Sequence, residues 1–376
     1  MEYSQLLDLH LSQCEIFLSK AQNNSYSDLD KQNYQNNLTS LFYAIKSNLP
    51  AELNENNLFV IQGQLNFIAK SLEFLMDSTL NTIPFEVVSC LNLAMDDWIP
   101  EETFIIVTSL NNDIDAYSFD EKLANEDYIY DSIFAGYGIS FEKRLVQINL
   151  PLILARDYFS SVILYHELGH FIDLYYGMSK RMATELIKCP PHEWTKIQEY
   201  FDFHQNPLKI KRLKNHLGEY FCDLFAAQYI GKTSNHYLNY LESKGADRTY
   251  GSHPSSNNRL AIVNDFLESK PNPLVEIIKK YIQEITKSDL TKRYKVLNSD
   301  DFYNFLPLEL GNSGELHGIF PYAWKIWLDG AEKFKSNAGI EGELPSKVIY
   351  KSLNNLIEKS IGNYFILKDW EGLKVS

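Results

Sequence analysis

Apolar residues recur at helical spacing from about residue 3 to residue 80. The stretches LLDLHLSQCEIFLSKA and NNLFVIQGQLNFIAKSLEFLMDSTL both place apolar side chains three or four positions apart, which predicts amphipathic helices. An Asn-rich and Ser-rich segment around residues 23–38 predicts a linker between two of them. We therefore expect residues 1–98 to form a helical N-terminal region.

The pattern changes after the Trp-Ile-Pro sequence at residues 98–100. TFIIVTSL (103–110) is short and rich in β-branched residues, and RLVQINL (144–150) alternates in strand fashion. SIFAGYG (132–138) is small and punctuated by glycine, so it is the better candidate for an edge strand that a peptide backbone can approach. These segments predict a small mixed sheet in which RLVQINL is the next strand inward.

Helical spacing returns after Pro151. Asp157 is a candidate N-cap for a helix that runs to about Tyr176 and ends at Gly177. Further helices are expected near 180–188, 192–203, 208–230, 258–268 and 273–287, and residues 290–376 also have a helical, aromatic-rich pattern. The fold class is therefore α+β, mainly α, with residues 1–98, 99–270 and 271–376 as a helical N-terminal region, a central domain and a helical C-terminal region.

Composition narrows the class of protein. Of the 376 residues, 45% are hydrophobic and 22% are charged, which is typical of a folded globular chain. A net charge of -14 argues against binding to nucleic acid or to an anionic membrane, because both need clustered Lys and Arg. We expect no secretory signal, because the first residues lack a basic n-region and a cleavage site. No apolar run reaches the roughly 18 residues of a membrane span, and the cysteines form no CxxC pair. We expect a cytoplasmic protein with reduced thiols.

The stretch ILYHELGHFID (163–173) carries the first candidate chemistry. His166 and His170 are one helical turn apart, so both imidazoles leave the same face and can occupy two positions of a tetrahedral zinc ion. Glu167 lies about 100° around the helix from His166, where a general base for a zinc-activated water belongs. HExxH arises by chance in on the order of one in a hundred such sequences, so a buried helix with hydrogen-bonded histidines is the alternative.

A third protein ligand is expected further along the chain, because Tyr176 stands where the metzincin motif has its third histidine. HLGEYFCDLFAAQYIG (216–231) places Glu219 and Asp223 four residues apart on one helical face. Glu219 can complete a His, His, Glu site, and Asp223 can accept the free ring N–H of a ligand histidine. His216 is a rival ligand, and an ordinary amphipathic helix with a solvent-facing acidic pair is the alternative.

Three motifs in this order resemble the gluzincin metallopeptidases, whose site combines HExxH with a downstream ExxxD. They are HELGH (166–170), EYFCD (219–223) and SHPSSNNR (252–259), the last being similar to a segment of the HtpX and CAAX-prenyl protease branch. Without the family, SHPSSNNR is a helix start with Ser252 or Ser256 as the cap and Pro254 in the first turn. The resemblance implies a zincin-like catalytic domain with an active-site helix pair. It also implies zinc ligands His166, His170 and Glu219, the base Glu167, the supporting Asp223, and His253 and Arg259 near the active site.

The chain departs from that branch in two ways. Its members usually carry transmembrane helices, and we expect none in this chain. Cys222 stands where they commonly have alanine; we interpret it as a small buried hydrophobic residue, and the alternative is a thiol near zinc that tunes or inhibits the site. Soluble ImmA-type gluzincins, which cut regulatory repressors, have a stretch close to EYFCDLFA. The gap of 48 residues between His170 and Glu219, together with SHPSSNNR, favours the HtpX-like arrangement.

The sequence predicts a zinc-dependent endopeptidase that acts on a protein or peptide substrate. Peptidases of this kind bind the substrate as an extra strand on a sheet edge, and His253 or Tyr250 is the candidate for stabilising the oxyanion. Two alternatives stay open. One is an ImmA-like sensor or effector protease that a regulatory partner switches on through the helical ends, and the other is a catalytically inert scaffold that binds zinc.

Overall fold

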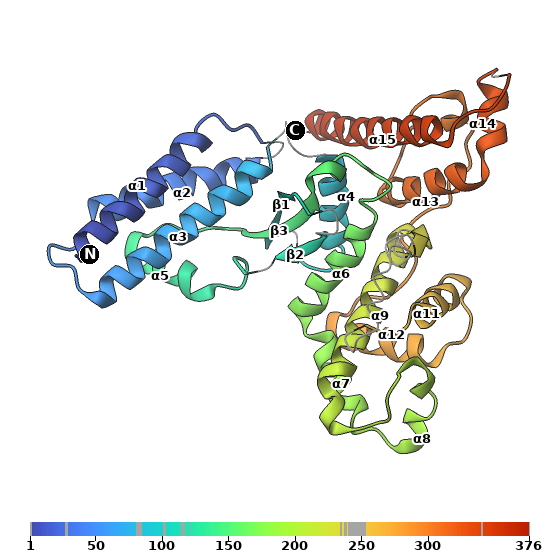
Figure 1. Cartoon of the computed structure of the whole chain (residues 1–376), viewed down its shortest axis with the longest axis horizontal. Coiled ribbons are helices and arrows are strands. Elements are labelled where there is room, and N and C mark those ends of the chain that lie inside the picture. The colour runs from blue at the N-terminus through green and yellow to red at the C-terminus, as the bar shows by residue number, and fades with distance from the viewer. Residues whose placement is uncertain are drawn as a thin grey trace. The chain divides into compact units, whose positions relative to one another are not determined.

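The computed structural model describes residues 2–26, 29–79, 85–100, 103–113, 117–120, 122–233, 235–236, 239, 253–339 and 341–375. Within these ranges the chain is mainly helical with one three-stranded sheet, which confirms the predicted α+β, mainly α class (Figure 1). It divides into two compact units, residues 1–88 with 99–156 and residues 89–98 with 157–376. This division differs from the predicted boundaries after residues 98 and 270, because the strands pack with the N-terminal helices.

In the first unit the apolar faces of the helices pack against one another and against residues of the sheet, which gives one hydrophobic core. Leu38, Leu65, Ile68 and Leu72 are fully buried in its core. The predicted linker around 23–38 is wrong for its second half, because Leu38 belongs to a helix whose buried residues recur at helical spacing. Its described helices are α1 (Tyr3–Ala21), α2 (Leu29–Ser47), α3 (Glu55–Asp77) and α5 (Asp127–Tyr137), with α4 (Phe85–Asp96) at the boundary between the units.

The sheet contains β1 (Phe104–Asn111), β2 (Ser118–Asp120) and β3 (Arg144–Pro151) in the order β1-β3-β2. β1 pairs with β3 in parallel and β2 pairs with β3 antiparallel, so the sheet is mixed. The two predicted strands 103–110 and 144–150 are confirmed as β1 and β3, and β3 is the inner strand.

The predicted edge strand at 132–138 is wrong, because these residues form most of helix α5 and the turn after it. Tyr130 and Ile133 supply a buried face at helical spacing, and Gly138 ends the helix in the left-handed conformation with φ 66°. The small residues of this segment therefore form the end of a short helix, and the glycine that follows them terminates it. This segment therefore has no strand edge for a peptide substrate to extend.

The second unit contains helices and irregular segments, and no strand among its described residues. The predicted helix from Asp157 begins later, at Ile163, because Asp157 caps a turn by accepting hydrogen bonds from the backbone N–H groups of Phe159 and Ser160. The predicted helix at 192–203 contracts to α8 and a 3-10 turn at 198–200. The helices are α6 (Ile163–Tyr176), α7 (Met178–Leu186), α8 (Pro191–Trp194), α9 (Ile210–Ile230), α11 (Ser256–Glu268), α12 (Pro273–Thr286), α13 (Ser313–Asp329), α14 (Ala331–Asn337) and α15 (Ser346–Val375).

Helix α9 is the centre of this unit, since every residue from His216 to Ile230 is buried. Helices α6, α7, α11 and α13 all pack against it (Figure 1). The predicted alternative of a solvent-facing acidic pair on this helix is wrong, because Glu219 and Asp223 are only 8% and 0% exposed. Two ionisable side chains in the core of a helical unit need specific partners.

Among the described residues, no helix is long and apolar enough to cross a membrane.

Candidate metal centre

The site is built where α6 and α9 cross in close contact, at Gly169 and Cys222. A Cβ atom on Gly169 would lie 2.9 Å from the Cα of Cys222 and 3.2 Å from its sulfur. Only glycine therefore allows this crossing, and the glycine lies inside HELGH between Glu167 and His170. The close contact brings the side chains of one helix into direct contact with those of the other.

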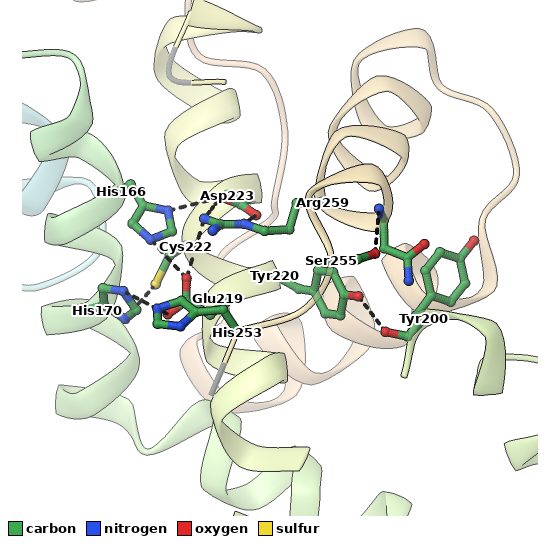
Figure 2. A network of polar contacts seen from close by, with 11 residues as sticks. His166, His170, Tyr200, Glu219, Tyr220, Cys222, Asp223, His253, Ser255 and Arg259 are labelled. Atoms are coloured by element: carbon green, nitrogen blue, oxygen red, sulfur yellow. Dashed lines mark hydrogen bonds and ion pairs between the residues drawn. The ribbon is translucent and has the colours of Figure 1, made fainter. Parts of the chain in front are cut away.

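The two histidines of HELGH face the same carboxylate. Nε2 of His166 lies 3.4 Å from Oε2 of Glu219, and Nε2 of His170 lies 3.6 Å from Oε1 (Figure 2). Two ligand atoms of a tetrahedral zinc with bonds of about 2.0–2.1 Å are about 3.3 Å apart. The predicted ligands His166, His170 and Glu219 therefore lie close together, and each histidine faces a different oxygen of the carboxylate.

Asp223 supports this set from the next turn of α9. Its Oδ1 lies 3.0 Å from Nδ1 of His166, the ring nitrogen that does not face Glu219. Arg259 donates to both carboxylate oxygens of Asp223 at 2.7 Å, and it lies 3.4 Å from Oε2 of Glu219. Asp223 and Arg259 therefore both lie beside His166 and Glu219, and the supporting role of Asp223 stays a prediction (Figure 2).

His253 also reaches the centre, although it comes from the segment before α11. Its Nε2 lies 3.3 Å from Oε1 of Glu219, and its side chain is 34% exposed. Ser255, rather than Ser252 or Ser256, caps α11 by accepting from the N–H of Asn258, and Asn258 donates to the carbonyl of Glu199. These bonds anchor the segment that carries His253 and Arg259.

Glu167 lies on α6 directly after His166 and is partly buried. Its place on the helix is about 100° around from His166, next to the histidine pair. Tyr250 and Ser252, which the sequence made candidates for the oxyanion and for the helix cap, lie outside the described residues.

Cys222 contacts the centre, whereas the sequence favoured the interpretation of an unremarkable buried thiol. Its sulfur lies 3.2 Å from Nδ1 of His170. Single ligand atoms of His166, His170 and Cys222 all lie within 4.8 Å of one another, so this group could hold a metal ion. The sequence did hold one indication of this contact, the position of Cys222 immediately before Asp223. Consecutive residues on a helix can each reach a different turn of a neighbouring helix.

His216, the predicted rival ligand, lies apart from this group. It is 1% exposed, stacks on Phe201 and packs edge-on against Phe203. Neither of its ring nitrogens has a hydrogen-bond partner among the described residues, and burial lowers its pKa to about 4. A neutral imidazole inside an aromatic cluster is the role that this environment favours.

The electrostatics of the centre are dominated by two carboxylates and their cations. Burial lowers the pKa of His166, but Asp223 and Glu219 outweigh burial and raise it to about 9. Burial and the charge of His166 lower the pKa of His170 to about 4. Burial raises the pKa of Glu219 and of Asp223, yet His166 and Arg259 hold both below their usual values. One protonated and one neutral histidine therefore face two ionised carboxylates at neutral pH.

No protein-family model matches the sequence, and neither a curated protein nor a solved structure matches it significantly.

Proposed function

We propose that this chain is a zinc-dependent peptidase of the gluzincin type. The observation that carries the proposal is the orientation of the histidine pair. Both Nε2 atoms of HELGH face the carboxylate of Glu219 on a second helix, while the opposite ring nitrogen of His166 faces Asp223. Three ligands from two helices leave a fourth position open, which is the arrangement of catalytic rather than structural zinc.

The donor set also suits zinc by its chemistry. Imidazole nitrogens and one carboxylate are ligands that zinc accepts, and the contact with Asp223 is typical of a histidine held for metal binding. When bound, zinc would polarise the scissile carbonyl and lower the pKa of a water molecule to near 7.

The side chains of this chain supply the remaining steps. Glu167, next to His166, is placed to take a proton from the attacking water and later to give it to the leaving amine. His253, 3.3 Å from Glu219 and about one-third exposed, can donate to the oxygen that gains negative charge at the substrate carbonyl. Arg259 acts at a distance from the substrate by fixing the carboxylates of Asp223 and Glu219.

The experiment compares cells that express the wild-type chain with cells that express Glu167→Gln, and it searches both proteomes for new peptide termini. Glutamine keeps the size and the hydrogen-bonding capacity of the side chain but cannot take up a proton, so we expect termini that appear only with the wild type. Glu193→Gln is a matched control, because HEWTK has the same His-Glu pair without a second histidine. Equal termini in wild type and Glu167→Gln would contradict the proposal.

The inert-scaffold alternative predicts a different pair of results from the same proteins. A scaffold would bind zinc but would produce no peptide terminus that depends on Glu167. A peptidase would bind zinc and would also produce such termini. A partner-switched protease would yield Glu167-dependent termini only in cells that contain the partner.

A further inference from the structure

Two consecutive residues of α9 approach the two histidines of HELGH at the same ring nitrogen. Asp223 lies 3.0 Å from Nδ1 of His166, and the sulfur of Cys222 lies 3.2 Å from Nδ1 of His170 (Figure 2). In both rings the other nitrogen, Nε2, faces Glu219 at 3.4 and 3.6 Å. Each histidine is therefore contacted at Nδ1 by its own partner from α9.

We infer that Cys222 is a positioning residue for His170, with its sulfur accepting a hydrogen bond from the Nδ1–H of that ring. A neutral imidazole has one donor and one acceptor nitrogen, so an acceptor at Nδ1 leaves Nε2 free for the metal. This inference rests on the proposed metal site. It assigns to a thiol the task that a carboxylate or a carbonyl performs for most metal-binding histidines.

His170 needs such a partner more than His166 does. The side chain of His170 is 37% exposed, whereas that of His166 is 4% exposed and is confined by its surroundings. A half-exposed ring on a helix samples more than one orientation unless a contact fixes it. Because Cys222 lies at the crossing with Gly169, its sulfur is held in place by the backbone contact of the two helices.

Direct metal binding by Cys222 is the competing role, since its sulfur belongs to the group that lies within 4.8 Å. One observation favours positioning. The sulfur is in hydrogen-bond contact with Nδ1, the nitrogen of His170 that does not face Glu219. The two ring nitrogens of a histidine point in different directions, so a metal held at Nε2 beside Glu219 lies away from the nitrogen that the sulfur contacts.

The first test measures the zinc dissociation constant of the full chain by competition with a chromophoric chelator. We expect Cys222→Ala to bind zinc about tenfold more weakly, because loss of a partner that orients a ligand histidine typically costs 10–100-fold and sulfur is a weak acceptor. Cys222→Ser keeps an acceptor oxygen and should stay within about threefold of the wild type. Cys14→Ala, which removes a buried thiol that donates to the carbonyl of Leu65, is the matched control and should leave the constant unchanged.

Equal affinity in all four proteins would overturn the inference, and so would equal losses in Cys222→Ala and Cys222→Ser, which indicate packing alone. Thermal unfolding of each variant establishes that it is folded. A wild type that binds no zinc would overturn the proposed function and this inference together. Zinc binding that is insensitive to Cys222 would overturn this inference only.

The second test replaces zinc by Co²⁺ and records the absorption spectrum of the wild type. If the thiol only positions His170, the spectrum should show the visible bands of tetrahedral cobalt. It should show no sulfur-to-cobalt charge-transfer band in the near ultraviolet. A charge-transfer band that Cys222→Ser abolishes would show that the sulfur binds the metal directly, and it would overturn the positioning role.

Discussion

His166 is the residue on which the charge balance of the site depends. It lies between Glu219 and Asp223 in a position that is almost fully shielded from water, and Arg259 supplies the other nearby positive charge. Two ionised carboxylates in a helical core need about two positive charges to be tolerated. In the metal-free protein the proton on His166 provides the second of them, and zinc would provide it in the loaded protein.

This balance predicts that the metal-free protein loses stability as the pH rises from about 6.5 to about 9. The pKa of His166 is raised from 6.5 to about 9 in the folded state, so over this range the folded chain holds a proton that the unfolded chain has released. The free energy of unfolding should fall by up to about 1.4 kcal/mol per pH unit. Urea unfolding at several pH values measures the slope, and His166→Gln should flatten it.

Zinc affinity should change with pH in the opposite direction over the same range. Binding must displace the proton from His166, so the affinity should rise about tenfold per pH unit until the pH reaches about 9. Competition titrations with a chelator of known pH dependence measure this change. An affinity that is constant between pH 7 and pH 9 would contradict the assignment of His166 as a ligand.

At the scale of the elements, the crossing of α6 and α9 determines whether the site forms. Gly169→Ala should destabilise the protein by about 1–3 kcal/mol, because the new Cβ would lie 2.9 Å from backbone of Cys222 that cannot move aside. Gly218→Ala is the matched control on α9, since its Cβ would come no closer than 3.4 Å to any atom. Chemical unfolding compares the two variants, and equal stabilities would contradict the account of the crossing.

Arg259 connects α11 to the buried carboxylates of α9. Arg259→Gln leaves Asp223 buried without its strongest partner and should cost about 3–5 kcal/mol of stability. Arg212→Gln removes a cation that pairs with Asp202, whose side chain is 54% exposed, so it should cost less than about 1 kcal/mol. Unfolding curves measure both changes. Similar losses of stability in the two variants would show that the buried pair of Arg259 and Asp223 stabilises the protein no more than an exposed pair does.

The sequence predicted the side chains of the centre better than it predicted the elements around them. The four-residue spacings of His166 with His170 and of Glu219 with Asp223 define helical faces, and the structure brings these faces together. The hydrogen bond of Cys222 with His170 was not predicted, because it depends on how closely two helices cross. Part of helix α5 was predicted as an edge strand because its residues are small, and the helix has only two buried residues, Tyr130 and Ile133, to mark a helical face.

At the scale of the whole molecule, the C-terminal helices belong to the unit that holds the centre. Tyr165, the neighbour of His166 on α6, is hydrogen-bonded to Nδ1 of His317 on α13 at 2.8 Å, and both side chains are fully buried. Tyr350 on α15 donates to Asp157 and stacks on Phe159. The C-terminal region therefore stabilises α6 directly.

Removal of residues 290–376 should consequently destroy the centre rather than release its activity. The truncated chain would expose Tyr165 and other apolar side chains of α6 and α9 that α13 covers. We expect an aggregated or partly folded product with little zinc, as measured by circular dichroism and metal analysis after size-exclusion chromatography. A monodisperse fragment that binds zinc like the full chain would instead support a separable regulatory region.

The most direct measurement of the central claim is the zinc content of the full chain, purified without a histidine tag, for the wild type and for His166→Ala, His170→Ala and Glu219→Ala. A centre made by these three residues predicts about one equivalent of zinc in the wild type and a large loss in each variant. His216→Ala, from the aromatic cluster on the same helix, should keep the wild-type content. Less than about half an equivalent in the wild type, with no further loss in the three variants, would contradict the account.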